Sequence, residues 1–431
     1  MKRAIVWFKT DIRSHDNETL FRAMEQSDEI IPVYCIDDVH FTTSEYGFKK
    51  NGNFRAQFLL ESLIDLDKSL RSIGSGLIVV RGKPEIEIPA LVIKYKVDKV
   101  FAKKEFVHEE LITQNNVEHA LANIDCLFES YSTDTLYHQD DLPFSLNDIP
   151  NVFTDFRRKI ERESSVRELF PAPSFIKSPP IEMLQLPELE QLGLEQVKYD
   201  ERAVVSFNGG ETEGINRLHH YLTGTHAIAT YKQSRNGMIG SDYSSKFSAW
   251  LAMGCLSPSL IYHEIKKYES QFTANESTYW LIFELLWRDF FSFMFKKYPV
   301  QFFHLNGIKN KQTTIAQHND ALFEKWKNGK TGNDFIDANM LELKLTGFMS
   351  NRGRQNVASF FCHDLKLDWR YGAAYFEQQL IDYDVCSNWG NWAYIAGVGN
   401  SPRNGSVFNV DKQANDYDKD KSYRNLWLQH H

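Results

Sequence analysis

Three serines in TYKQSRNGMIGSDYSSKFSAWLAMGCLSP (230–258) are placed where they could hold an anion. Ser244, Ser245 and Ser248 precede the apolar run AWLAMGCL, so we expect them at or near the first turn of a helix. Free backbone N–H groups, the helix dipole and hydroxyl donors favour a negatively charged ligand at such a place. Simple capping of the helix by one hydroxyl is the alternative.

The stretch FELLWRDFF (283–291) combines two opposite charges with an aromatic ring. Glu284 and Arg288 are four residues apart, so on a helix they share one face. They could contact a ligand together, or form only a surface ion pair. Trp287 could contact the same ligand or belong to the core.

A third stretch, TGFMSNRGRQN (346–356), predicts a tight turn that is rich in hydrogen-bond donors. Glycines flank its polar residues, which are Asn351, Arg352 and Arg354. The two arginines make this turn basic.

In the fourth stretch, LIDYDVCSNWGNWAY (380–394), Asp382 and Asp384 lie in a predicted loop and Asn388 follows them. These groups could bind a ligand through hydrogen bonds. The competing interpretation is a calcium loop, but the spacing of an EF-hand is absent.

Composition limits the classes of protein that fit. Forty-nine basic and 57 acidic residues give a net charge of −8, which excludes a uniformly basic surface but allows a local basic cleft for nucleic acid. The odd number of scattered cysteines indicates reduced thiols, and no His or Cys spacing predicts a metal site. No signal peptide or membrane span is evident, so we expect a cytoplasmic protein, without membrane attachment. The cysteines are Cys35, Cys126, Cys255, Cys362 and Cys386.

The first 130 residues alternate short apolar runs with amphipathic segments. This order predicts a Rossmann-like α/β domain (1–130), in which helices cover a parallel sheet and ligands bind beyond the carboxyl ends of the strands. No GxGxxG or Walker A motif is present, so ordinary dinucleotide or nucleoside triphosphate binding is unsupported there. The predicted strands are 4–8, 30–36, 76–80, 99–102 and 125–128.

Beyond residue 130 the pattern changes twice. Residues 131–204 lose the periodicity and contain PAPSFIKSPP, so we expect a long connector that is wrapped over the surface. Residues 205–431 have helical period almost throughout and predict an all-helical domain.

In their sequence, spacing and order, the four stretches resemble the flavin-binding motifs of the photolyase/cryptochrome family. VWFKTDIRSHDN (6–17) is similar to the opening strand of photolyases, and the resemblance covers nearly the whole chain. NGGETEGINRL (208–218), YSSKFS (243–248) and AYIAGVGN (393–400) resemble the DASH branch in particular.

The resemblance implies FAD as a non-covalent cofactor inside the helical domain. Arg354 would pair with Asp382 beside the isoalloxazine, and Asn388 would face flavin N5. Tyr231 and the run 244–248 would bind the pyrophosphate and ribose side. The full implied set is Tyr231, Ser244, Ser245, Lys246, Phe247, Ser248, Arg288, Asn351, Arg354, Asp382, Asp384 and Asn388.

The resemblance also implies a pocket for a flipped-out cyclobutane pyrimidine dimer. Trp287 and Tyr394 would offer flat faces to the lesion, and Glu284 would bond a thymine edge. Photolyases of duplex DNA have Trp at the place of Tyr394, which favours single-stranded substrates here. The lining would be Glu284, Trp287, Asn351, Gln355 and Tyr394, with Arg235, Arg352 and Gln413 on the DNA backbone.

An electron-transfer chain of tryptophans is implied in part. Trp392 and Trp369 match its inner members, which photoreduce the flavin. The outer member would lie ten residues before Trp326, where this chain has Ala316. Trp389 and Tyr371 are candidate replacements on sequence proximity.

In the N-terminal domain, DASH proteins commonly hold a methenyltetrahydrofolate antenna. Glu105 in FAKKEF matches a carboxylate that binds its pterin, and an ordinary surface Glu is the alternative.

The expected function is that of a monomeric deoxyribodipyrimidine photo-lyase. Excited reduced FAD would donate an electron to the dimer, with Trp392, Trp369, Asn388 and Glu284 as the catalytic group. The alternative is a blue-light signalling cryptochrome with little repair activity, and the short segment after Leu428, with no signalling tail, favours repair. An NAD(P)H-dependent flavoprotein is disfavoured by the lack of a nicotinamide fingerprint.

Overall fold

The computed structural model describes residues 2–310, 319–402 and 405–429. Its N-terminal part is built on a five-stranded sheet in which every pairing is parallel and the strand order is β3-β2-β1-β4-β5. The predicted α/β architecture is therefore confirmed. The strands are β1 (Arg3–Phe8), β2 (Glu29–Ile36), β3 (Ile78–Arg81), β4 (Lys99–Lys103) and β5 (Leu127–Tyr131).

Alternation along β1 explains why helices cover both faces of the sheet. Ile5 and Trp7 point into a smaller core, which α3 and α4 close. Val6 and Phe8 belong to the large core on the opposite face, which α1 and α2 cover. Side chains alternate across a strand, so a strand buried on both faces reads as one continuous apolar run. The four helices are α1 (Glu18–Gln26), α2 (Asn53–Ser72), α3 (Pro84–Tyr95) and α4 (His108–Ala122).

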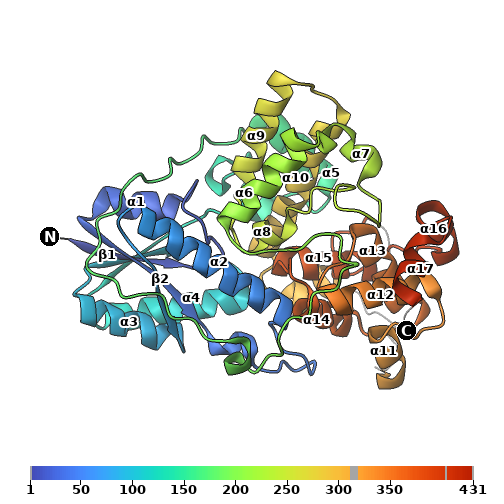
Figure 1. The fold of residues 1–431 in the computed structure, drawn as a ribbon, viewed down its shortest axis with the longest axis horizontal. Helices are drawn as coiled ribbons and strands as arrows, with labels where there is room; N and C mark the ends of the chain where they lie inside the picture. Colours follow the sequence, from blue (N-terminus) through green and yellow to red (C-terminus); the bar gives the residue numbers. More distant parts are fainter. Residues whose placement is uncertain (1, 311–318, 403–404, 430–431) are drawn as a thin grey trace.

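The connector contains a helix that the sequence pattern did not predict. α5 (Phe153–Glu163) buries Phe153, Phe156 and Ile160, and Phe156 lies 5.3 Å from Phe290 between ring centroids. The helix was overlooked because its apolar face is carried by three residues among eight polar ones. Much of the rest of 164–204 is irregular backbone that passes across the α/β region (Figure 1).

The C-terminal part is helical, as predicted. Figure 1 shows it to the right of the sheet, with α10 near its upper centre and α12, α13 and α15 below. The longest member, α10, begins at a capping box formed by Asn275 and Thr278. The helices are α6 (Glu211–His219), α7 (Tyr231–Ser234), α8 (Ser248–Ala252), α9 (Pro258–Gln271), α10 (Glu276–Lys297), α11 (Asp320–Lys327), α12 (Asp334–Thr346), α13 (Asn351–Ser359), α14 (Trp369–Gln379), α15 (Val385–Ala396), α16 (Val410–Tyr417) and α17 (Ser422–Leu428).

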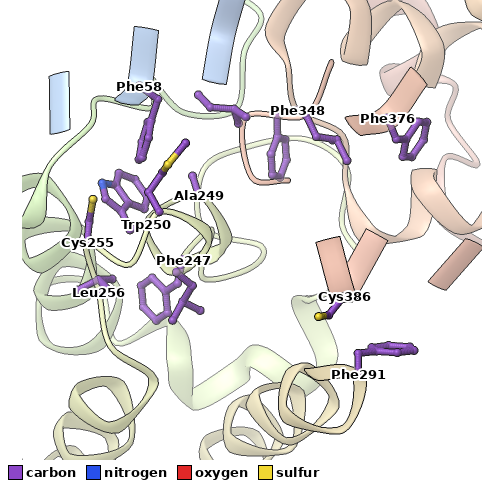
Figure 2. Close-up of a cluster of buried hydrophobic side chains, with 14 of the residues drawn as sticks. Phe58, Phe247, Ala249, Trp250, Cys255, Leu256, Phe291, Phe348, Phe376 and Cys386 are labelled. Atoms are coloured by element: carbon purple, nitrogen blue, oxygen red, sulfur yellow. The ribbon is translucent and has the colours of Figure 1, made fainter. Parts of the chain in front are cut away.

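The two parts share one core. Trp250 of α8 packs against Phe58 of α2, with 5.9 Å between ring centroids, and Figure 2 shows both rings in a single apolar cluster. Close by, Gly254 meets the Thr10 carbonyl so closely that a Cβ would lie 2.1 Å from the oxygen. A side chain at Gly254 would therefore force the two parts of the protein apart.

Among the described residues, no helix has both the length and the apolar character that a membrane crossing requires.

Candidate functional site

The helical part encloses a cavity of about 520 Å³, in the size range of cofactor pockets. Side chains from α10, α13 and α15 and the segment before α8 line it. Most of the predicted site residues lie on this lining. They are Tyr231, Arg235, Ser244, Ser245, Lys246, Phe247, Ser248, Glu284, Trp287, Arg288, Asn351, Arg354, Gln355, Asp382, Asp384 and Tyr394.

The other predicted residues are distributed around this cavity. Asn388 and Trp392 line an adjoining space of about 120 Å³, which shares Arg354 and Asp382 with the larger one. Arg352 and Gln413 lie behind Gln355, since the Arg352 Nη1 donates to Gln355 Oε1 at 2.9 Å and to Gln413 Oε1 at 3.4 Å.

The segment 244–248 forms a concave donor site on the lining. Arg217 of α6 draws two of its carbonyls to one side, by donating to Ser244 O at 3.3 Å and Ser245 O at 2.9 Å. Lys246 adopts a left-handed backbone conformation, with φ of 63°. The next residue, Phe247, is right-handed, with φ of −69° and ψ of −12°. Successive residues of opposite hand turn their N–H groups toward one point and form an anion-binding concavity.

Capping of α8 by a serine is not observed. Phe247 occupies the N-cap position without a side-chain cap bond, and the Ser248 Oγ donates instead to Asp382 Oδ2 at 2.6 Å. Because α8 has only five residues, the expected contribution of a long helix dipole is also absent.

A charged pair stands where the larger cavity meets the adjoining one. The Arg354 Nη2 donates to both oxygens of Asp382, at 3.0 and 2.8 Å, as expected. The Asp382 side chain is 2% exposed, so the pair is desolvated on the carboxylate side. It presents one cation and one acceptor, which suit a polar, partly charged ring edge.

The predicted basic turn at 346–356 is wrong in its second half, because α13 begins at Asn351. The Ser350 Oγ accepts from the Gly353 N–H at 3.0 Å and caps this helix. Gly353 also packs directly against Asn339, so its small size reflects close packing. Asn351 and Arg354 reach the cavity from the first turn of α13.

α15 supplies one polar face to the two cavities. Asp384 caps the helix by accepting from the Ser387 N–H at 2.7 Å, and Asn388 Nδ2 donates to Ala373 O at 3.0 Å. Ser387 and Asn391 line both cavities and were not predicted. Their helical spacing from Asp384 and Asn388 was the signal that could have found them.

Glu284 and Arg288 do not form the ion pair considered from their spacing. Glu284 bonds Arg235, while the Arg288 Nη1 donates to the Asp134 carbonyl. Burial raises the pKa of Glu284, although Arg235 opposes the rise. The Arg235–Glu284 pair is therefore the polar contact on this side of the cavity.

Trp287 and Tyr394 form an aromatic corner on the cavity lining. Their ring centroids lie 6.2 Å apart at an angle of 88°. Trp287 is held from behind by Phe153 of α5, which stacks on it at 3.7 Å and 12°. Trp287 is thus both a core contact and a lining residue.

A second cavity, of about 240 Å³, lies beyond the carboxyl ends of β1, β2 and β4. This is the crevice predicted for the sheet, beside the switch in strand order at β1. Glu105 lies on its lining between two lysines, 3.6 Å from Lys9 Nζ and 3.7 Å from Lys103 Nζ. Since Glu105 is buried, it is not an ordinary surface residue.

The same cavity contains a carboxylate that sequence reasoning missed. Glu110 has a buried oxygen, Oε2, that finds no hydrogen-bond partner among the residues that the structure describes. Burial, and then the charge of Glu105, raise the pKa of Glu110 to about 7. Its position in the first turn of α4, next to the exposed Glu109, carried no signal in the sequence.

Known proteins similar to this chain cover it almost completely. A sequence model described as DNA photolyase matches residues 4–174, and one described as the FAD binding domain of DNA photolyase matches residues 280–430. The cryptochrome DASH of Gloeobacter violaceus is 48% identical over 430 residues, which span 99% of this chain and 85% of that protein. The chain belongs to the photolyase/cryptochrome family, among the DASH cryptochromes.

Solved structures of photolyases and cryptochromes share its fold. The crystal structure of a Synechocystis cryptochrome has a TM-score of 0.96 and 46% identity, and the match covers 100% of this chain and 89% of that one. A photolyase from Sulfolobus tokodaii, solved with two FAD molecules, has a TM-score of 0.81 and 26% identity, over 99% of this chain and 90% of that one. This family member is accordingly a flavin-dependent, photolyase-like protein.

The residues of the 520 Å³ cavity fit FAD. The concave donor site at Lys246 suits a pyrophosphate, and the Arg354–Asp382 pair suits a ring with both donors and acceptors. The two features line one continuous cavity, as one dinucleotide requires.

Proposed function

We propose that this protein repairs cyclobutane pyrimidine dimers in DNA under blue light, as a deoxyribodipyrimidine photo-lyase. Bound FAD would supply the light-absorbing group and the electron that opens the dimer. The observation that carries the proposal is one cavity that joins the Arg354–Asp382 pair to the aromatic corner of Trp287 and Tyr394.

In this proposal, the chain's residues bind and orient both groups. The 244–248 segment and Tyr231 would hold the pyrophosphate and ribose side, with Arg288 nearby, and Asp384 would meet the ring or the ribityl edge. Arg354 and Asp382 would fix the ring, and Asn388 would face N5 with an amide already held by Ala373 O. Trp392 and Trp369 would return electrons to an oxidised cofactor.

The aromatic corner would receive the flipped lesion. Two faces at 88° can cover a folded pair of pyrimidines on two sides. Glu284 would bond a base edge with an oxygen not used by Arg235, and Asn351 and Gln355 would add polar contacts. Arg235, Arg352 and Gln413 would serve the DNA backbone, with Arg352 acting through its bonds to Gln355 and Gln413.

We further propose a preference for single-stranded DNA. A tyrosine at position 394 offers a smaller stacking surface than an indole, and stacking must offset the cost of extracting a paired base. In a single strand that cost is already met. We also propose that the protein is a monomer in a reducing compartment such as the cytoplasm. Five free cysteines support the reducing compartment.

The 240 Å³ cavity is the proposed antenna site, with 5,10-methenyltetrahydrofolate as its ligand. Support comes from Glu105 on its lining and from its place next to the flavin cavity. Ala252, Arg288 and Asp384 line both cavities, so an antenna there would lie a few side chains from the flavin. A second flavin in this site is the alternative outcome of chromophore extraction.

One experiment tests the repair proposal. Purified protein, with FAD reduced chemically, is illuminated with dimer-containing oligonucleotides, either single- or double-stranded. We expect loss of the dimer in light and not in darkness, and faster loss in single strands. Intact dimers in both substrates would favour the signalling alternative.

A further inference from the structure

The outer end of the proposed electron-transfer chain lacks the tryptophan that the resemblance implies. Position 316, where the resemblance expects the third tryptophan, is Ala316, and it lies outside the described residues. The two inner tryptophans are linked through α14. The Trp392 indole packs on Gly372, which lies one turn after Trp369 in this helix. A Cβ at Gly372 would lie 2.3 Å from the Trp392 indole. An electron that enters through Trp369 must come from another donor.

Trp389 is the aromatic side chain placed to be that donor. Its ring lies edge-on to Trp369, with 5.8 Å between centroids. The Trp389 Nε1 donates to Glu377 Oε2 at 3.2 Å, and this bond fixes the orientation of the indole. Trp389 itself is only 4% exposed, so a charge on it has no direct contact with solvent.

Tyr46 is the next aromatic side chain after Trp389 on this route. It belongs to the loop before α2, in the N-terminal part, and its ring lies 6.2 Å from Trp389 between centroids. Unlike Trp369 and Trp389, Tyr46 is partly exposed. Burial raises the pKa of its phenol to about 12, so the resting side chain carries its proton.

A second aromatic branch leaves Trp392 but ends inside the protein. Trp326 lies 6.1 Å from Trp392 and 5.8 Å from Tyr375 between ring centroids. Trp326 is fully buried and Tyr375 is 3% exposed, and burial raises the pKa of Tyr375 strongly. A phenol oxidised there could not pass its proton to water, so this branch cannot trap the charge.

We propose that Trp389 and Tyr46 replace the missing tryptophan, with Tyr46 as the terminal electron donor of the chain. This inference rests on the proposed roles of Trp392 and Trp369. One electron would move from Tyr46 to Trp389, then to Trp369 and Trp392, and the photoexcited flavin is the oxidant. The oxidised phenol releases its proton to water, and an external thiol later returns one electron and one proton to the tyrosyl radical.

The test uses the FAD-loaded protein under blue light with a thiol donor. Flavin bleaching gives the rate of photoreduction, and electron paramagnetic resonance of samples frozen during illumination identifies the radical. We expect a tyrosyl signal in wild type that narrows when the protein is made with ring-deuterated tyrosine. Y46F should lose this signal, and W389F should lose it and slow photoreduction several-fold.

Matched variants make the result specific. Y375F and W326F alter the buried branch and should keep the tyrosyl signal. Y371F should also keep it, because Tyr371 is not part of the proposed route, although its ring lies 5.2 Å from that of Tyr46 between centroids. A narrowed signal that persists in Y46F, or is lost in Y371F, would overturn Tyr46 as the terminal donor. Wild-type photoreduction in W389F would overturn the route.

Failure of the underlying proposal has a different signature. Normal photoreduction in W392F would contradict the whole tryptophan chain. If W392F is inactive and W389F is normal, only the route through Trp389 and Tyr46 is contradicted. Repair of dimers by W389F after chemical reduction should equal that of wild type, because the exit is then bypassed. FAD content and melting temperature of each variant verify that it is folded.

Discussion

The Arg354 guanidinium and the Asp382 carboxylate meet through Nη2, 3.0 Å from Oδ1 and 2.8 Å from Oδ2, where the two helical cavities join. Ser248 completes the group, since its Oγ donates to the same carboxylate at 2.6 Å. Three segments that are far apart in sequence therefore converge on one buried carboxylate.

Asp382→Ala should lower FAD occupancy, because it leaves the Arg354 charge unpaired beside the cofactor. Removal of one partner of a buried pair costs about 3–5 kcal/mol, and part of this cost would fall on binding. The measurement is the ratio of flavin to protein after purification. Thermal unfolding without added FAD separates lost binding from lost folding, and full occupancy in a folded variant would remove Asp382 from the site.

Trp287→Ala should weaken binding of dimer-containing single strands by about 1–3 kcal/mol, through loss of a stacking face. Titration of labelled damaged and undamaged oligonucleotides measures the difference between them. Tyr279→Ala is the matched control, because Tyr279 is on the same helix, bonds Arg157 and Glu161, and is not on the cavity lining. Equal affinities of wild type for damaged and undamaged strands would contradict a lesion pocket here.

Glu105→Gln should release the antenna while FAD is retained. The change removes the charge that faces Lys9 and Lys103 but keeps the shape of the side chain. Chromatography of the extracted chromophores measures both ligands in one sample. The control is Glu109→Gln, since Glu109 lines the same cavity with a side chain that is 66% exposed. Antenna loss in both variants, or in neither, would argue against a specific role of Glu105.

The sequence predicted the central strands β1, β2 and β4 because burial on both faces makes each of them a distinct apolar run, whereas the edge strands β3 and β5 are only partly buried. The pairing of Arg354 with Asp382 was predicted only from the family resemblance, because no local pattern relates residues that are 28 positions apart. Local spacing suggested an ion pair between Glu284 and Arg288. In the folded protein, Glu284 pairs with Arg235 instead. The contact of Trp389 with Tyr46 depends on how the two parts of the protein pack, which no periodicity encodes.

Glu342 of α12 is a buried carboxyl group that interacts electrostatically with Lys246 of the cavity lining. Burial raises the pKa of Glu342 from its ordinary value of 4.5 to about 7, although the hydrogen bond from the Tyr423 hydroxyl, 2.6 Å from Oε2, opposes the rise. Between pH 4.5 and about 7, Glu342 therefore keeps its proton in the native state and loses it in the unfolded state. The associated stability is complete below pH 4.5 and is lost as the pH rises through about 7.

Glu342→Gln should remove this dependence, because the amide cannot ionise and its oxygen can still accept from Tyr423. Relative to the variant, wild type should lose up to about 3 kcal/mol of unfolding free energy between pH 5 and pH 8. Urea unfolding at several pH values measures the difference. Glu276→Gln, at a side chain that is 79% exposed, should follow wild type throughout. If the curves of wild type and Glu342→Gln run parallel, Glu342 has the same protonation in the folded and unfolded states.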